Sequence, residues 1–215
     1  MTSDEIAGFA DPVRVYSYAD VLGRPSPVPT QDGVYGWWFA KLPPLVVADG
    51  CRQHQGLRLL YAGISPNRPP QNGRPPSRQS LRDRIKYHYT GNAEGSTLRK
   101  TLGCLLADDL GIQLRRVGSG NRMTFVEGEQ ALSGWMAQNA YVSWVVRGRP
   151  WELEDELIAE LDLPLNLQGN PHNRFHSVRR VRARCVAQAR ALPVLPNPSI
   201  GGGRQARTSA PRQQP

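Results

Sequence analysis

The sequence predicts a small mixed α/β or α+β domain in which a few short strands are flanked by amphipathic helices. A length of 215 residues fits one compact core with flanking segments. Hydrophobic residues make up 39% of the chain, which is enough to fill such a core. Segments rich in aromatic and branched residues alternate with segments whose apolar residues recur at helical spacing. We therefore expect one folded domain with strands and helices mixed along the chain.

The two ends of the chain differ in composition from its middle. Residues 1–30 end in three closely spaced prolines, which lack a backbone N–H and predict an extended lead-in. Residues 193–215 are rich in Pro, Gly, Ser, Arg and Gln, which predicts a disordered basic tail. The folded domain is then expected over residues 31–192.

Strand signals occur in two places. Residues 33–39 and 57–62 are rich in aromatic and branched residues and are bounded by turn formers, so they predict two neighbouring strands. Residues 123–126 and 141–146 have similar composition, and a helical pattern over 129–138 lies between them. This second pair predicts a strand-helix-strand insertion in the domain.

Helix signals lie between and after these strands. Ser80 and Asp83 form a capping-box signature that opens a helix through Tyr89, and Ser96 can cap a second helix. Residues 176–190 read as a basic amphipathic helix, with arginines away from the apolar side formed by Val178, Val181, Cys185 and Ala189. The domain is thus expected to carry several helices around its strands.

The helix expected over residues 151–161 contains one misplaced charge. At about 100° per residue, Glu154 falls inside the apolar arc that Leu153, Leu157, Leu161 and Ile158 define, whereas the other acidic residues fall outside it. A carboxylate on the apolar side is costly unless it is hydrogen-bonded, neutralised or bound to a cation. Glu154 therefore either pairs with a nearby arginine, sits at the exposed end of the stripe, or serves a function.

Charge and motif content narrow the function classes. The chain has 27 Lys and Arg against 18 Asp and Glu, and this net charge of +9 favours a polyanionic partner. No Walker loop, HExxH or nucleophile-elbow pattern occurs, which argues against ATPases, zincins and serine hydrolases. No apolar run approaches the ~20 residues of a membrane helix, and the acidic N-terminus does not resemble a signal peptide. We expect a cytoplasmic protein without a membrane partner.

Five elements in chain order resemble the GIY-YIG nuclease family: Gly33-Val-Tyr35, Tyr61-Ala-Gly63, the helix with Arg84 and His88, Glu154, and Asn166. In that family the two tyrosine motifs lie on adjacent strands of a small central antiparallel sheet flanked by helices. The resemblance implies the same fold here. It also implies a metal-dependent endonuclease that hydrolyses phosphodiester bonds, in DNA before RNA.

The resemblance assigns roles to the matched residues. Tyr35, Tyr61, Arg84, His88 and Asn166 are carried over as catalytic residues, and Glu154 as both a catalytic residue and the metal ligand. One carboxylate is enough for Mg²⁺ (or Mn²⁺), because Mg²⁺ keeps most of its waters and takes other ligands from the phosphate. An arginine offers a planar fork for two phosphate oxygens. A tyrosine can activate water only if the cation or the arginine stabilises its phenolate.

Each assignment has a structural alternative. The two tyrosines could pack across strands, Arg84 could pair with Asp83, His88 could be a satisfied helix residue, and Asn166 could close a turn after Pro164. A non-catalytic nucleic-acid-binding module on the same fold is the alternative function. A zinc-stabilised interaction domain is a further one, with the ligands Cys51, His54, His172 and His176.

Basic residues near the expected site predict a surface that follows the phosphates of DNA. The candidates for nucleic-acid binding are Arg78, Lys86, Arg99, Lys100, Arg179 and Arg180. Such contacts would give affinity without reading bases, and a solvated helix face is the alternative for the last two. Nothing in the sequence predicts an oligomeric state.

Overall fold

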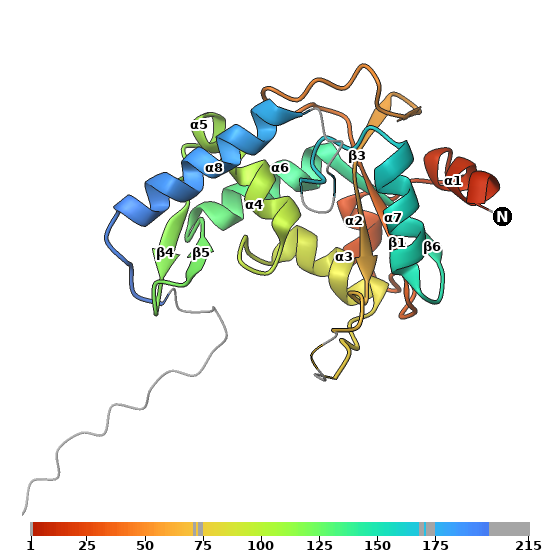
Figure 1. Ribbon diagram of the computed structural model, residues 1–215, viewed down its shortest axis with the longest axis horizontal. Helices are drawn as coiled ribbons and strands as arrows, with labels where there is room; N and C mark the ends of the chain where they lie inside the picture. Colours follow the sequence, from red (N-terminus) through yellow and green to blue (C-terminus); the bar gives the residue numbers. More distant parts are fainter. Residues whose placement is uncertain (1, 71, 73–74, 168–169, 171–174, 198–215) are drawn as a thin grey trace, which may run out of the picture.

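The computed structural model describes residues 2–70, 72, 75–167, 170 and 175–197. Its centre is a four-stranded antiparallel sheet in the order β2-β3-β1-β6, flanked by helices (Figure 1), and this confirms the predicted α+β class. The strands of this sheet are β1 (Gly33–Phe39), β2 (Gln53–His54), β3 (Leu57–Ser65) and β6 (Ala140–Val146).

The helices follow the chain around this sheet, and a small two-stranded sheet lies outside it. The helices are α1 (Thr2–Ala10), α2 (Tyr18–Leu22), α3 (Leu81–Thr90), α4 (Thr97–Leu105), α5 (Ala107–Leu110), α6 (Gly128–Asn139), α7 (Pro150–Glu160) and α8 (His176–Ala191). The second sheet pairs β4 (Arg115–Val117) with β5 (Arg122–Thr124). The expected strand-helix-strand segment therefore begins in the small sheet with β5 and ends in the central sheet with β6.

The central strand β1 is buried along its whole length, because β3 and β6 pair with its two edges and helices cover both faces. On one face, Trp38 packs with apolar residues of α1 and α7. On the other face, Trp37 packs with residues of α3, α4 and α6. Tyr35 and Trp37 lie opposite Gly63 and Tyr61 of β3, so both tyrosines share this second face.

Two glycines of the tyrosine motifs allow close approach. A Cβ at Gly63 would lie 2.6 Å from the Tyr35 hydroxyl oxygen, and a Cβ at Gly33 would lie 2.2 Å from the carbonyl oxygen of Val145. Neither contact is possible for a larger residue without movement of the strands. Gly63 thus lets the Tyr35 hydroxyl approach β3 closely, and Gly33 lets β1 approach β6 closely.

Residues 1–30 are not the extended lead-in that the prolines predicted. They contain α1 and α2, and Ile6 and Phe9 are buried against the sheet. Tyr16 exchanges backbone hydrogen bonds with Val142 of β6 at 2.8 and 2.9 Å. A capping box of Ser17 and Asp20 opens α2, and this local signal outweighs the prolines that follow.

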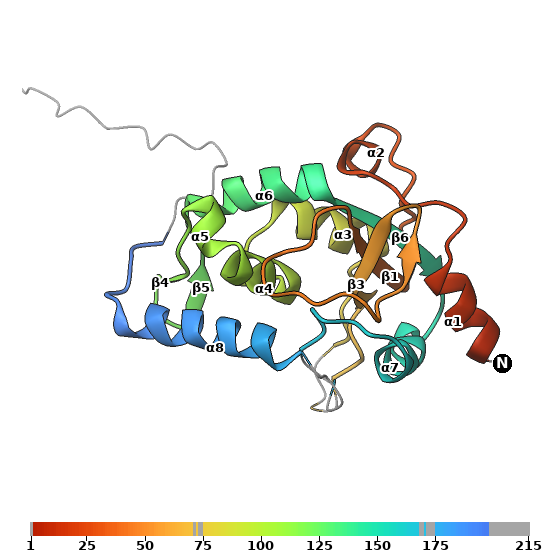
Figure 2. The same cartoon turned by 90° about the horizontal axis from the view of Figure 1, so that it is seen from above.

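The C-terminal segment is ordered as far as it is described. Val178 and Ala189 of α8 are buried, and α8 lies beside α4 in both views (Figures 1 and 2). Leu195 pairs with Val117 of the small sheet, so the start of the predicted disordered tail is bound to the domain. Residues 198–215 lie outside the described residues. Among the described helices, none is long and apolar enough to cross a membrane.

Candidate active site

Tyr35 and the two matched residues of α3 meet on one face of the sheet. The capping box at Ser80 starts α3 and fixes Arg84 and His88 one turn apart. The Tyr35 oxygen lies 2.7 Å from Nε2 of His88, and Arg84 Nε donates to the same oxygen at 3.3 Å. Arg84 is also anchored by a 2.7 Å hydrogen bond from Nη1 to the carbonyl of Gly95. Three sequence-predicted residues therefore form one hydrogen-bonded group.

The positions of the protons among these side chains depend on the contact of His88 with Ser96. The Ser96 oxygen caps α4 by accepting from the backbone N–H of Arg99 at 3.1 Å, and it lies 2.7 Å from Nδ1 of His88. Both ring nitrogens of His88 thus contact hydroxyl oxygens, and Nε2 donates to Tyr35 in the tautomer whose Nδ1 accepts from Ser96. Burial, with the positive charges of Arg84 and Arg99, holds the pKa of His88 well below its usual value. His88 is therefore a neutral imidazole at neutral pH.

The two tyrosines are both protonated at neutral pH in this structure. Burial, and then the neighbouring Tyr61, raise the pKa of Tyr35, while the charge of Arg84 acts in the opposite direction. Burial likewise raises the pKa of Tyr61, whose hydroxyl lies 3.5 Å from Oγ1 of Thr97. Arg84 donates to the Tyr35 oxygen, so the phenolate of Tyr35 is favoured over that of a tyrosine buried without such a donor.

Glu154 faces a cavity of about 270 Å³ beside the second tyrosine. Leu153 and Leu157 of α7 are buried, and Glu154 on the same side of the helix is half-buried, as the helical arc predicted. Within the described chain Glu154 makes no hydrogen bond or ion pair, and the nearby Arg68 pairs with Asp155 instead. Burial, and then the negative charge of Asp155, raise the pKa of Glu154 to about 7.

These properties fit a divalent cation. A half-buried carboxylate without a partner is an uncompensated acceptor, and hard cations prefer oxygen ligands of this kind. The described residues contain no group of three or more potential metal-ligating side chains, so a cation here would take its other ligands from water and substrate. For the zinc alternative, His54 is bonded to Asp11 at 2.8 Å, and His172 lies outside the described residues.

Asn166 joins the segment after α7 to the part of the β3 edge that lies beyond β2. Its Nδ2 donates to the carbonyl of Ala62 at 2.8 Å, and its Oδ1 accepts from the Ala62 N–H at 2.9 Å. The Leu165 N–H donates to the carbonyl of Leu60 at 3.0 Å. Asn166 thus acts like an added strand residue, and it brings one wall of the cavity to the strand that carries Tyr61.

The predicted phosphate-binding residues fall into two groups. Four are exposed, namely Arg78, Lys86, Arg179 and Arg180. Lys100 is partly buried and pairs with Glu94 at 3.5 Å. The prediction for Arg99 is wrong, because its side chain is 0% exposed. No local sequence pattern predicts the burial of Arg99, because its carboxylate partner Glu129 is thirty residues away in the chain.

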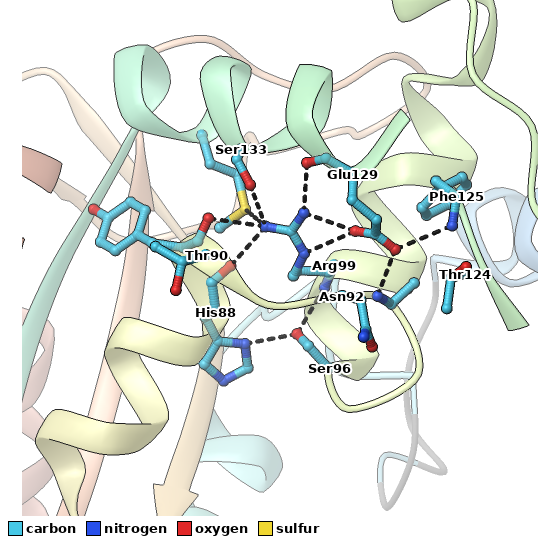
Figure 3. Close-up of polar contacts among 12 residues, drawn as sticks. His88, Thr90, Asn92, Ser96, Arg99, Thr124, Phe125, Glu129 and Ser133 are labelled. Atoms are coloured by element: carbon cyan, nitrogen blue, oxygen red, sulfur yellow. Dashed lines mark hydrogen bonds and ion pairs between the residues drawn. The ribbon is translucent and has the colours of Figure 1, made fainter. Parts of the chain in front are cut away.

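Figure 3 shows what surrounds Arg99. Its guanidinium donates to the Glu129 carboxylate, to the carbonyl oxygens of His88 and Tyr89, and to the hydroxyl of Ser133. All these acceptors belong to the protein, so the group has no donor left for a nucleic acid. Arg99 is a structural residue that joins α4 to α3 and α6.

The sequence reasoning gave no place in the site to Thr97 and Arg182, which both line the cavity. Thr97 lies at the first position of α4, and Arg182 comes from α8. Arg182 follows the buried Val178 by one helical turn, and that spacing is the signal that could have placed it near the core side. It reaches the cavity because α8 packs along α4.

Tyr61 and Glu154 line one cavity, and the charges of Arg84 and Glu154 act on both tyrosines. A tyrosine pair, an arginine and a lone carboxylate placed this close to one another define a phosphodiester-cleaving class of site, since they can bind a phosphate and a cation together. The family model of the GIY-YIG catalytic domain matches residues 33–185, and the protein belongs to this family. Comparisons with curated proteins and with solved structures gave no match. Membership of the family implies nuclease activity, as the motif order predicted.

Proposed function

We propose that the protein is a DNA endonuclease that hydrolyses phosphodiester bonds with one Mg²⁺ or Mn²⁺ ion. The observation that carries this proposal is Glu154, a half-buried carboxylate with no partner among the described residues, beside Tyr61 in a cavity. The net charge of +9 and the exposed arginines support a polyanionic substrate.

Glu154 is the residue that would hold the cation. When bound, a divalent cation neutralises the charge that grows on the phosphate oxygens and on the departing 3′ oxygen. The cavity of about 270 Å³ leaves room for the waters that Mg²⁺ retains. The raised pKa of Glu154 means that the carboxylate form gains from a positive charge at this position.

Arg84 binds the phosphate in this proposal. Its Nε and Nη1 are held by Tyr35 and by the carbonyl of Gly95, which fix the plane of the guanidinium. Its Nη2 makes no hydrogen bond in the part of the chain that the structure describes, so that nitrogen can donate to a phosphate oxygen. An arginine suits this role because its charge persists at every relevant pH.

Tyr35 takes the proton from the attacking water. Arg84 donates to the Tyr35 oxygen, and His88 donates to it in the tautomer with the proton on Nε2, so the two side chains stabilise the phenolate that accepts this proton. Since burial raises the pKa of Tyr35, the phenolate is scarce at neutral pH, and the charge of Arg84 or of the cation is needed to stabilise it. Tyr61, at the cavity wall, donates to a phosphate oxygen.

Cleavage of supercoiled plasmid tests the proposal. Wild type should nick the plasmid with Mg²⁺ or Mn²⁺ and not with chelator, and Glu154→Gln should bind DNA without cutting it. Glu160→Gln removes an exposed charge from the same helix and should cut like wild type. If folded wild type binds but never cuts plasmid, linear or branched DNA, the non-catalytic module becomes the better description.

A further inference from the structure

A groove continues from the Glu154 cavity along α8. The cavity is lined by Leu167 and Arg182, and the same two residues line a second hollow of about 420 Å³. The remaining walls of that hollow all come from α8. Because the two hollows share Leu167 and Arg182, they adjoin each other, and the second extends along α8 from Arg179 to Val186.

Arg182 stands at the junction of the two hollows. Its contact with the protein is weak, since Nη1 donates to Oγ1 of Thr101 at 3.5 Å. Among the described residues Arg182 has no carboxylate partner. Its positive charge acts on Tyr61 and lowers the pKa of that hydroxyl, although burial outweighs this effect. A half-buried guanidinium without a counter-charge is therefore placed beside the candidate site.

Arg179 extends this charge along the groove. It precedes Arg182 by three residues, so both lie on one face of α8. Its Nη2 donates to the carbonyl of Leu167 at 3.1 Å, which turns the guanidinium toward the groove. Arg180 and Arg184 belong to the same helix, but both are exposed and neither lines the groove.

We propose that Arg182 and Arg179 bind the phosphates next to the scissile one, so that a DNA strand runs from Glu154 along α8. This inference rests on the proposed nuclease function and deepens it. The groove offers two arginines for phosphates, and Ala183 and Val186 for sugar carbons. No base edge is read by such a surface, so it sets affinity and strand direction.

Salt-dependent DNA binding tests this site. All proteins carry Glu154→Gln so that the DNA stays intact, and a labelled duplex is titrated in Mg²⁺-free buffer at several salt concentrations. Arg182→Ala and Arg179→Ala should each reduce the slope of log Kd against log salt by about one, the value expected for one lost phosphate contact. Arg182→Ala should weaken binding by about tenfold at fixed salt, which corresponds to one charge-assisted contact.

Arg184→Ala is the matched control, because it removes the same charge from an exposed position of the same helix. Arg184→Ala should retain the slope measured for the parent protein, which carries Glu154→Gln alone. Equal losses in all three variants would overturn the proposal, because α8 would then act only as a diffuse positive surface. Arg182→Lys should recover part of the affinity, which separates lost binding from a folding defect.

A chemical change in the DNA provides an independent readout. One neutral methylphosphonate is placed at successive positions on either side of the cut site, still in the Glu154→Gln protein. A methylphosphonate that weakens binding when Arg182 is present, but not in Arg182→Ala, identifies the phosphate that Arg182 contacts. If no position shows this coupling, or if the protein binds no DNA at any salt, the proposed track does not exist. Loss of cleavage with an intact track would instead contradict only the proposed chemistry.

Discussion

Two glutamates of this protein lie near arginines in opposite ways. Glu129 is bonded directly to the buried Arg99, and the two side chains form an ion pair at 2.7 Å. Glu154 lies close enough to Arg84 for that charge to lower its pKa, yet the two side chains form no ion pair. The Glu129 carboxylate is fully hydrogen-bonded within the protein, whereas the Glu154 carboxylate is available to bind a ligand.

The Glu129 cluster satisfies every oxygen of its carboxylate. Oε2 accepts from Arg99, and Oε1 accepts from the backbone N–H groups of Ala93 and Phe125 at 2.8 and 3.0 Å. Three segments of chain are joined by one side chain (Figure 3). A buried charge with this many partners contributes to a unique packing and offers nothing to a ligand.

Breaking the satisfied pair is expected to have the largest effect on stability. Arg99→Met leaves Glu129 buried without its counter-charge, and should lower the free energy of unfolding by about 3–5 kcal/mol. Urea denaturation followed by circular dichroism measures this. Glu154→Gln, which removes an unpaired carboxylate, should cause no comparable loss. Equal losses in the two variants would remove the distinction between the two glutamates.

Removing Arg84, the arginine near the unpaired Glu154, should instead affect catalysis. Arg84→Ala should reduce kcat by about 10²–10³-fold, the range found when one donor to a developing negative charge is lost. Its unfolding free energy should change much less than that of Arg99→Met. Single-turnover cleavage of a labelled duplex gives the rate, and Arg84→Lys, which keeps the charge without the fork, should fall between Arg84→Ala and wild type. An active Arg84→Ala protein would contradict the phosphate-binding role.

Ser96 connects the two regions, since it bonds His88 and caps the helix that carries Arg99. The proposed chemistry uses the His88 tautomer with its proton on Nε2, and Ser96→Ala removes the hydroxyl that donates to Nδ1 in that tautomer. Cleavage should slow about tenfold, equivalent to roughly one ordinary hydrogen bond. Ser96→Thr, which keeps the hydroxyl, is the control. If Ser96→Ala cuts at the wild-type rate, the proton arrangement proposed for His88 is wrong.

The sequence predicted the elements that carry their own signals. The capping box at Ser80 starts α3, and the apolar arc of α7 marks Glu154 as a half-buried carboxylate. Both signals act within a few residues of the chain, so they survive whatever the rest of the fold does. The same holds for the two tyrosine motifs, whose strands are adjacent as the family resemblance implied.

The sequence failed where the outcome depends on segments far apart in the chain. Arg99 was assigned to the surface because Glu129 joins it only after α4 and α6 pack together. Arg182 was given no role because it meets Tyr61 only through the packing of α8 on α4. Charge alone cannot distinguish these two arginines, and the position of a counter-charge can.

The remaining expected effect concerns the pH dependence of stability. Because the pKa of Glu154 in the folded protein is about 7 rather than the ordinary 4.5, the folded state binds a proton that the unfolded state has lost between these values. The contribution of Glu154 to stability is therefore present at low pH and is lost as pH rises through about 7. Comparing the Tm of wild type with that of Glu154→Gln at pH 5 and pH 8 isolates this term.

Relative to Glu154→Gln, wild type should lose Tm between the two pH values, whereas Glu160→Gln, altered at an exposed site, should follow wild type. Mg²⁺ or Mn²⁺ added at pH 8 should raise the Tm of wild type but not that of Glu154→Gln, because only the folded protein presents the site. Chelator should reverse this gain. A pH-independent difference between wild type and Glu154→Gln would show that Glu154 already has a partner, and would place it with Glu129 among the structural carboxylates.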